Sequence, residues 1–184
     1  MNDFKKHYRQ TVIPKVQKEL SISNANAAPR LKAIHVNVGI GTYLKTHKDF
    51  VPLVENIARI TGQKPVVTKA RMAISNFKLR QFQPNGITVT LRGQRMYDFV
   101  NKLVNIVLPR VRDFRGIPTK AFDKNSNYSL GITEHTVFPE VRLDDELKPF
   151  GLQVTIVTTA KKKEEGEALL RALGFPFIKE KPKK

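Results

Sequence analysis

The chain has no cysteine among its 184 residues. Without thiols it can form neither a disulfide framework nor a thiolate metal site, and it has no thiol nucleophile. It also lacks a run of about eighteen apolar residues, which a membrane-spanning helix requires. Its first ten residues, MNDFKKHYRQ, contain no signal-peptide core. We therefore expect a cytoplasmic protein of a reducing compartment, with no membrane-spanning helix.

Acidic residues are scarce as well. The chain has 16 Asp and Glu against 33 Lys and Arg, which gives a formal net charge of +17. Such an excess makes a polyanion the expected partner, because each neutralised phosphate releases counterions. Nucleic acid and an anionic membrane surface are the two candidates. The membrane surface is the weaker candidate. In a peripheral membrane protein the basic residues would share a helix with a large apolar face, whereas in this chain they cluster on expected strands and loops.

Residues 56–97 contain no acid at all. Strands are expected at 65–70 and 87–92, and in the second of these apolar and polar residues alternate strictly. The intervening loop, 71–86, combines cations with Phe77 and Phe82. A long basic loop that is held by a sheet is more often functional than not, although a solvated face is the plain alternative. The cations of the window are Arg59, Lys64, Lys69, Arg71, Lys78, Arg80, Arg92 and Arg95.

The hydrophobic pattern predicts an α+β fold, in which helices pack on one face of a mostly antiparallel sheet. The other face of the sheet stays open and polar, and suits a sugar–phosphate backbone. Residues expected on that face are Asn37, Thr88, Thr90, Arg92, Thr155 and Thr159. Strands are expected near 31–38, 65–70, 87–92 and 152–159, with a short edge strand within 133–141. Helices are expected at 47–61, 95–108 and 163–173, with a first helix over 4–20 that Pro14 kinks, Gly62 as a C-terminal cap, Pro109 as a stop and an irregular loop at 121–131.

Catalytic and cofactor motifs are weak in this sequence. Gly39 and Gly41 follow a strand, but the third glycine of a dinucleotide fingerprint is missing. The acids at 144–146 are more typical of a solvated helix start than of a cation site. The four histidines have no metal-ligand spacing and form no triad pattern. We therefore expect no enzyme, no cofactor, no metal and no catalytic residue, and an RNA-processing enzyme stays the alternative from another class.

Several blocks of residues stand out in order along the chain: GQKP at 62–65, TKAR at 68–71, VTLRG at 89–93, LPRVRDFRG at 108–116, NYSLG at 127–131, FPE at 138–140, TTA at 158–160 and GFPF at 174–177. With these blocks the chain, over about 29–178, closely resembles the bacterial-type large-subunit ribosomal protein family five, which binds 5S ribosomal RNA. The resemblance implies a single RNA-binding ribosomal domain over 1–178. The basic tail, 179–184, is expected to be disordered.

The resemblance also implies partners and sites. In that family the sheet side holds 5S RNA, which corresponds here to Asn37, Gln63, Lys64, Thr68, Thr90 and Arg92. The loop at 71–83 would reach P-site transfer RNA through Arg71, Ser75, Asn76, Lys78 and Arg80. An intersubunit bridge to a small-subunit head protein would use Arg110, Arg112 and Asp113 with the region 133–143. Neighbouring large-subunit RNA and proteins complete the implied partners.

Overall fold

The computed structural model describes residues 3–24, 26–46, 49–141 and 149–178. The predicted tail at 179–184 lies outside these residues and stays a prediction. The single RNA-binding domain over 1–178 also stays a prediction. The chain forms two compact units. The hairpin unit consists of His35–Leu91 and Gly131–Val154, and the helical unit of Met1–Ile34, Arg92–Leu130 and Thr155–Lys184.

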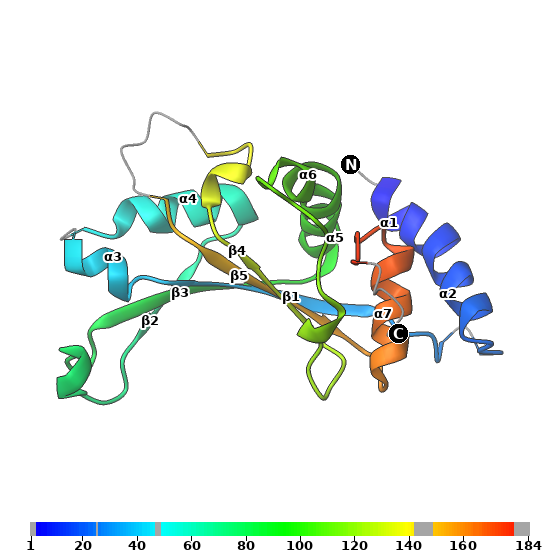
Figure 1. Cartoon of the computed structure of the whole chain (residues 1–184), viewed down its shortest axis with the longest axis horizontal. Helices are drawn as coiled ribbons and strands as arrows, with labels where there is room; N and C mark the ends of the chain where they lie inside the picture. The colour runs from blue at the N-terminus through cyan, green and yellow to red at the C-terminus, as the bar shows by residue number, and fades with distance from the viewer. Residues whose placement is uncertain (1–2, 25, 47–48, 142–148, 179–184) are drawn as a thin grey trace, which may run out of the picture. The chain divides into compact units, whose positions relative to one another are not determined.

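One open sheet contains five strands in the order β2-β3-β1-β5-β4 (Figure 1). β2 and β3 form an antiparallel hairpin in which Val66 pairs with Thr88 and Thr68 with Gly86. The predicted α+β class with an antiparallel sheet and an open face is confirmed. The strands are β1 (Leu31–Gly39), β2 (Val66–Lys69), β3 (Pro84–Leu91), β4 (Tyr128–Ile132) and β5 (Leu152–Thr158).

Alternation along the strands separates the two faces of the sheet in the hairpin unit. Val36 and Val89 are buried, whereas Asn37 and Thr90, their neighbours in sequence, reach solvent. This is the period of two that the sequence predicts, since successive side chains of a strand point to opposite faces. The apolar face is the one that the core covers, and the polar face is open to solvent.

Two helices of the hairpin unit contact β3: α3 (Gly41–Thr46) and α4 (Val51–Thr61). α4 ends at Gly62, whose φ of 65° is left-handed, so the predicted cap is confirmed. The helix begins at Val51, after Asp49 accepts the Val51 N–H at 2.9 Å, and not at the predicted residue 47. Residues 47–48 lie outside the described part of the chain, and α3 was not predicted.

Both long helical segments of the helical unit contain a π-helical stretch just before a proline. The first comprises α1 (Asp3–His7), π-helical η1 (Tyr8–Val12) and α2 (Ile13–Glu19); the second comprises α5 (Gly93–Lys102), π-helical η3 (Leu103–Val107) and α6 (Leu108–Arg110). Pro14 and Pro109 lack the N–H of a regular helix and crowd the preceding turn. The wider hydrogen-bonding of the π segments relieves this crowding. The second helix ends at Arg110, one residue beyond the predicted stop at Pro109, and the expected irregularity at Pro14 is confirmed.

Two predictions between α6 and β5 need correction. The predicted irregular loop at 121–131 ends at Asn127, because β4 begins at Tyr128, which is fully buried and donates its hydroxyl to the Pro118 carbonyl at 2.9 Å. The edge strand expected within 133–141 is a 3₁₀ turn, His135–Val137. β4 occupies the edge of the sheet, and Pro139 has no N–H to give to a ladder.

Helix α7 (Lys163–Ala172) packs against α2 and confirms the last predicted helix. Its N-terminus is closed by Glu165, which accepts the backbone N–H of Lys161 at 2.9 Å. Short 3₁₀ turns at Ser75–Phe77 (η2) and Thr119–Ala121 (η4) complete the secondary structure. None of the described helices is long and apolar enough to span a membrane.

Candidate nucleic-acid interface

A row of hydrogen-bonded polar side chains crosses from β1 to β3 on the open side of the hairpin unit. Thr88 Oγ1 donates to Asn37 Oδ1 at 2.7 Å, and His35 Nδ1 shares a hydrogen bond with Thr90 Oγ1 at 2.9 Å. Because the Asn37 carbonyl oxygen is held by Thr88, its Nδ2 group is directed outward as a donor. We call this surface, with Thr68 of β2, the polar face: His35, Asn37, Thr68, Thr88 and Thr90.

A depression of about 510 Å³ lies on the polar face. Asn37, Thr68 and Thr88 line it together with three glycines, one of which is Gly86. A Cβ at Gly86 would lie 2.9 Å from Thr68 Oγ1 and 3.2 Å from the Val38 carbonyl, so only glycine fits here without a shift. Because glycine has no side chain, another backbone can approach it closely. The depression therefore presents hydroxyl and amide groups to a ligand that can enter a shallow, open site.

Gln63 and Lys64 lie in the segment that connects α4 to β2. Gln63 Nε2 donates to the Thr90 carbonyl at 3.2 Å, which ties the turn after α4 to β3. Lys64 is exposed. The predicted set therefore falls into two parts: five of its members, Asn37, Gln63, Lys64, Thr68 and Thr90, belong to the hairpin unit, and the exposed Arg92 belongs to the helical unit.

The polar face also contains residues that were not among the predicted contacts. His35 and Thr88 each hold one of the predicted residues through the hydrogen bonds above. The alternation in sequence places both on the polar face, but their pairing depends on the register between β1 and β3, which a single sequence does not give. Gly86 was not predicted because the atoms that crowd it belong to Thr68 and Val38, which lie on other strands.

The loop at 71–83, which we call the basic loop, lies at the end of the β2–β3 hairpin (Figure 1). It is shorter than the predicted 71–86, because β3 begins at Pro84. Ile74 and Leu79 exchange backbone hydrogen bonds of 2.9 and 3.1 Å around the η2 turn. At the base, Phe82 N–H donates to the Ala70 carbonyl at 2.9 Å. Backbone hydrogen bonds therefore hold the loop together both at its tip and at its base.

All five predicted loop residues are exposed: Arg71, Ser75, Asn76, Lys78 and Arg80. Within the described part of the chain, no carboxylate forms an ion pair with the three cations. Phe77 and Phe82 are also exposed, with relative accessibilities of 72% and 69%. Unpaired cations beside solvent-exposed aromatic rings are a combination that single-stranded or looped RNA can use, through phosphate and base contacts respectively.

The predicted bridge residues lie in both units. Arg110 ends α6, and Arg112 and Asp113 follow in the next turn. Arg112 Nε and Asp113 Oδ2 are 3.9 Å apart and both side chains are almost fully exposed, so this ion pair contributes little to stability. Residues 133–141 belong to the hairpin unit, whereas 142–143 lie outside the described residues.

Within the 133–141 segment His135 has a structural role. Its ring stacks on Phe150 with centroids 3.9 Å apart, and its Nδ1 accepts the Phe150 N–H at 3.3 Å. The side chain is buried. Groups of three His, Asp or Glu side chains that could hold a metal are absent among the described residues.

The largest pKa shifts are those of two tyrosines that are packed inside the helical unit. Burial raises the pKa of Tyr8 to about 12, although the Leu31 N–H donates to its hydroxyl oxygen at 3.1 Å. Burial also raises the pKa of Tyr128 to about 12. For Asp123 burial favours the neutral acid, but hydrogen bonds from Asn127 and Asn125 outweigh it and lower the pKa. Each of these shifts is explained by local structure.

Comparison with known proteins assigns the chain to a family. Residues 24–80 match the family model described as Ribosomal protein L5, and residues 84–177 match the model for the C-terminus of the same ribosomal family. The first match ends within the basic loop, and the second begins at Pro84, directly after it. Large ribosomal subunit protein uL5 of Desulfatibacillum aliphaticivorans is 52% identical over 97% of this chain and 100% of its own length.

Two further relatives carry the same description. The uL5 protein of Synechococcus sp. (strain RCC307) is 50% identical over 94% of this chain and 97% of its own, and that of Anaeromyxobacter sp. (strain K) is 53% identical over 94% and 96%. The matches extend over nearly the whole chain, including the polar face and the basic loop. This chain belongs to the ribosomal protein L5 family.

Proposed function

We propose that the chain binds 5S ribosomal RNA through the polar face, contacts P-site transfer RNA through the basic loop, and joins an intersubunit bridge to a small-subunit head protein. Membership in the ribosomal protein L5 family makes it a structural constituent of the large ribosomal subunit and not an enzyme. Neighbouring large-subunit RNA and proteins are the remaining proposed partners. The finer assignments rest on the surfaces described above.

The observation that carries the 5S RNA assignment is the pair of cross-strand hydrogen bonds on the polar face. They fix the directions of Asn37 and Thr90 before any ligand binds. A pre-oriented amide or hydroxyl loses little freedom when it pairs with a 2′-hydroxyl or a phosphate oxygen. Lys64 and Arg92, both exposed, add charged donors, and Gln63 ties the turn that carries Lys64 to β3. Recognition would therefore follow the shape and backbone of the RNA more than its sequence.

The transfer RNA contact is supported by the exposed cations of the basic loop, which have no described carboxylate partner. The loop forms its own hydrogen-bonded turn, so its side chains can change without loss of the sheet. The bridge assignment is supported by Arg110 and Arg112, which are exposed at the end of a helix. Exposed cations such as these favour a partner protein with an acidic surface.

Binding of the full-length chain to 5S RNA at several salt concentrations tests the main proposal. Several phosphate contacts predict a fall in log affinity with log salt of about 0.7–0.9 per phosphate. A duplex of equal length should bind more weakly, and labelled RNA should stay intact with magnesium. Equal affinity for the two RNAs would reduce the interaction to generic electrostatics, and a flat salt response would remove the phosphate contacts altogether.

Replacement of Lys78 and Arg80 by alanine separates the two RNA contacts. Because both side chains are exposed, we expect the melting temperature and the 5S RNA affinity to stay nearly unchanged. Transfer RNA should dissociate faster from the P site of ribosomes that carry the variant. A large loss of 5S RNA binding would show that the loop belongs to the other interface.

The bridge is tested by the double change Arg110→Ala and Arg112→Ala. We expect weaker association of the two ribosomal subunits in sedimentation, because two charge-assisted contacts are lost. The affinity for 5S RNA should not change. Normal subunit association would argue against a bridge contact at this turn.

A further inference from the structure

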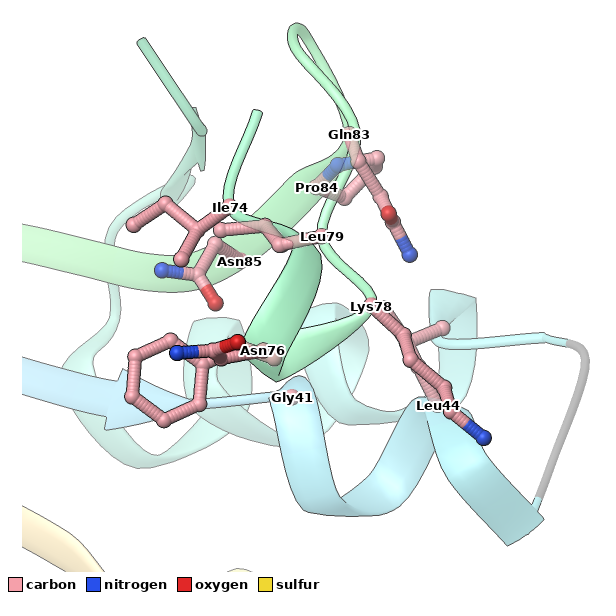
Figure 2. A pocket seen from close by; sticks show the side chains of 10 residues that line it. Gly41, Leu44, Ile74, Asn76, Lys78, Leu79, Gln83, Pro84 and Asn85 are labelled. Carbon is pink, nitrogen blue, oxygen red and sulfur yellow. The ribbon is translucent and has the colours of Figure 1, made fainter. Parts of the chain in front are cut away.

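A second cavity, of about 830 Å³, lies in the hairpin unit between the basic loop, the beginning of β3 and α3. We call it the loop pocket. Ile74, Leu79 and Pro84 contribute apolar surface, while Asn76, Asn85 and Lys78 contribute polar groups. Figure 2 shows the side chains of Asn76 and Asn85 over the start of α3, where Gly41 lies. The volume falls within the range of about 300–1,000 Å³ that is typical of sites for small molecules.

The lining of the loop pocket has three properties that together select its occupant. Among the described residues that line it, the only charged one is the cation Lys78. The side-chain amides of Asn76 and Asn85 make no hydrogen bond with the side chains and backbone that the structure describes. Phe77, which also lines the pocket, is 72% exposed and adds an aromatic ring to the lining.

We propose that the loop pocket holds one unpaired nucleobase of the RNA that the basic loop contacts. The inference rests on the proposed contact with transfer RNA, and adds to it a base site beside the phosphate contacts. Apolar surface and the ring of Phe77 cover the faces of the base. The amides of Asn76 and Asn85 pair with its edge, since an amide offers both a donor and an acceptor. Lys78 attracts the phosphate of the same nucleotide.

An apolar side chain from a protein partner fits this pocket less well. It would cover Asn76 and Asn85 without supplying donors or acceptors, and a buried polar group that stays unpaired is costly. An acidic side chain would satisfy Lys78 but would leave the apolar lining and the aromatic ring unused. A nucleotide combines a flat apolar face, a polar edge and a negative charge, and it alone uses each part of the lining.

Two substitutions alter the loop pocket without any change in charge. Gly41→Leu fills it from α3, and a Cβ there would lie 3.5 Å from Asn85 Oδ1, an ordinary contact at a backbone conformation open to any residue. Asn85→Leu removes an amide at nearly constant size and keeps the backbone carbonyl that accepts the Ile40 N–H at 3.1 Å. Asn125→Leu is the matched control, since Asn125 is an exposed asparagine in the helical unit.

The experiment measures the affinity of transfer RNA for the P site of ribosomes that contain each full-length variant, at low and at high salt. Gly41→Leu and Asn85→Leu should each lower the affinity by roughly fivefold or more, by the same factor at both salt concentrations, because they remove stacking and base contacts but no phosphate contact. The control should bind as the unchanged protein does. The double alanine variant of Lys78 and Arg80 should instead show a loss of affinity that shrinks as the salt concentration rises.

The results separate the inference from the proposed function. If the double alanine variant weakens binding and both pocket variants do not, the base site is wrong and the loop contact stands. If the double alanine variant has no effect, the proposed loop contact itself fails. If Gly41→Leu lowers the melting temperature strongly, Asn85→Leu alone decides. Tighter binding by Asn85→Leu would mean that an apolar group occupies the pocket, and would overturn the inference.

Discussion

The change Thr88→Val removes one hydroxyl from the polar face and keeps the shape of the side chain. In the structure this hydroxyl makes a single hydrogen bond of 2.7 Å, to Asn37 Oδ1. The bond is exposed to solvent, so its loss should cost at most about 0.5–1.5 kcal/mol of folding stability. Valine also suits a strand, which offsets part of the loss. We therefore expect a nearly normal melting temperature.

Binding to 5S RNA should respond more clearly than stability does. If Asn37 donates its Nδ2 to the RNA, it does so because Thr88 fixes its carbonyl oxygen. Without that anchor the amide must be ordered when the RNA binds, at a cost of about 0.5–1.5 kcal/mol, or roughly two- to tenfold in affinity. Thr136→Val is the matched control, because Thr136 is a part-exposed threonine in the hairpin unit outside the polar face.

A double-mutant cycle shows whether Thr88 acts through Asn37. In a chain that already carries Asn37→Leu, the change Thr88→Val should have no further effect on 5S RNA affinity, so the coupling energy should equal the effect of Thr88→Val alone. Filter binding or calorimetry at one fixed salt concentration measures all four proteins. Additive effects of the two changes, or an equal loss in the Thr136→Val control, would refute the reasoning.

Two further predictions concern stability. Gly86→Ala should lower the free energy of unfolding by roughly 1–3 kcal/mol, because its Cβ would meet backbone and side-chain atoms at 2.9–3.2 Å, whereas Gly131→Ala, with open space around its Cβ, should have little effect in the same denaturant titration. Alkaline pH should destabilise the fold: the pKa values of Tyr8 and Tyr128 are raised to about 12, so the stabilisation is complete below the ordinary value near 10 and is lost as the pH rises towards 12. Replacement of both tyrosines by phenylalanine should flatten this pH dependence between 10 and 12, and equal slopes for the two proteins would contradict it.

Much of the fold could be predicted from local patterns. The strict alternation of Ile87, Val89 and Leu91 identifies a strand and its buried face, and all three are buried in the structure. Gly62 identifies the end of a helix because its left-handed conformation favours glycine. Such signals lie within a few residues of the element that they specify, so a single sequence contains them.

Features that depend on distant parts of the chain could not be predicted in this way. Tyr128 lies in a stretch rich in Asn, Ser and Gly, which is typical of loops, and its strand forms because β5 offers an edge for pairing. The cross-strand bond from Thr88 to Asn37 depends on the register of β3 against β1. The loop pocket depends on α3 and the basic loop, neither of which has a strong periodic pattern.

The central claim is that the polar face of the sheet holds 5S RNA, and the side-chain amide of Asn37 reports on it most directly. Its Nδ2 protons can be followed by NMR during a titration of the full-length chain with 5S RNA, and Asn37→Leu identifies the signal. We predict that this signal shifts on binding, while the amide of Asn125 in the helical unit does not. If 5S RNA binds and the Asn37 amide signal stays unchanged, the RNA lies elsewhere and the account is contradicted.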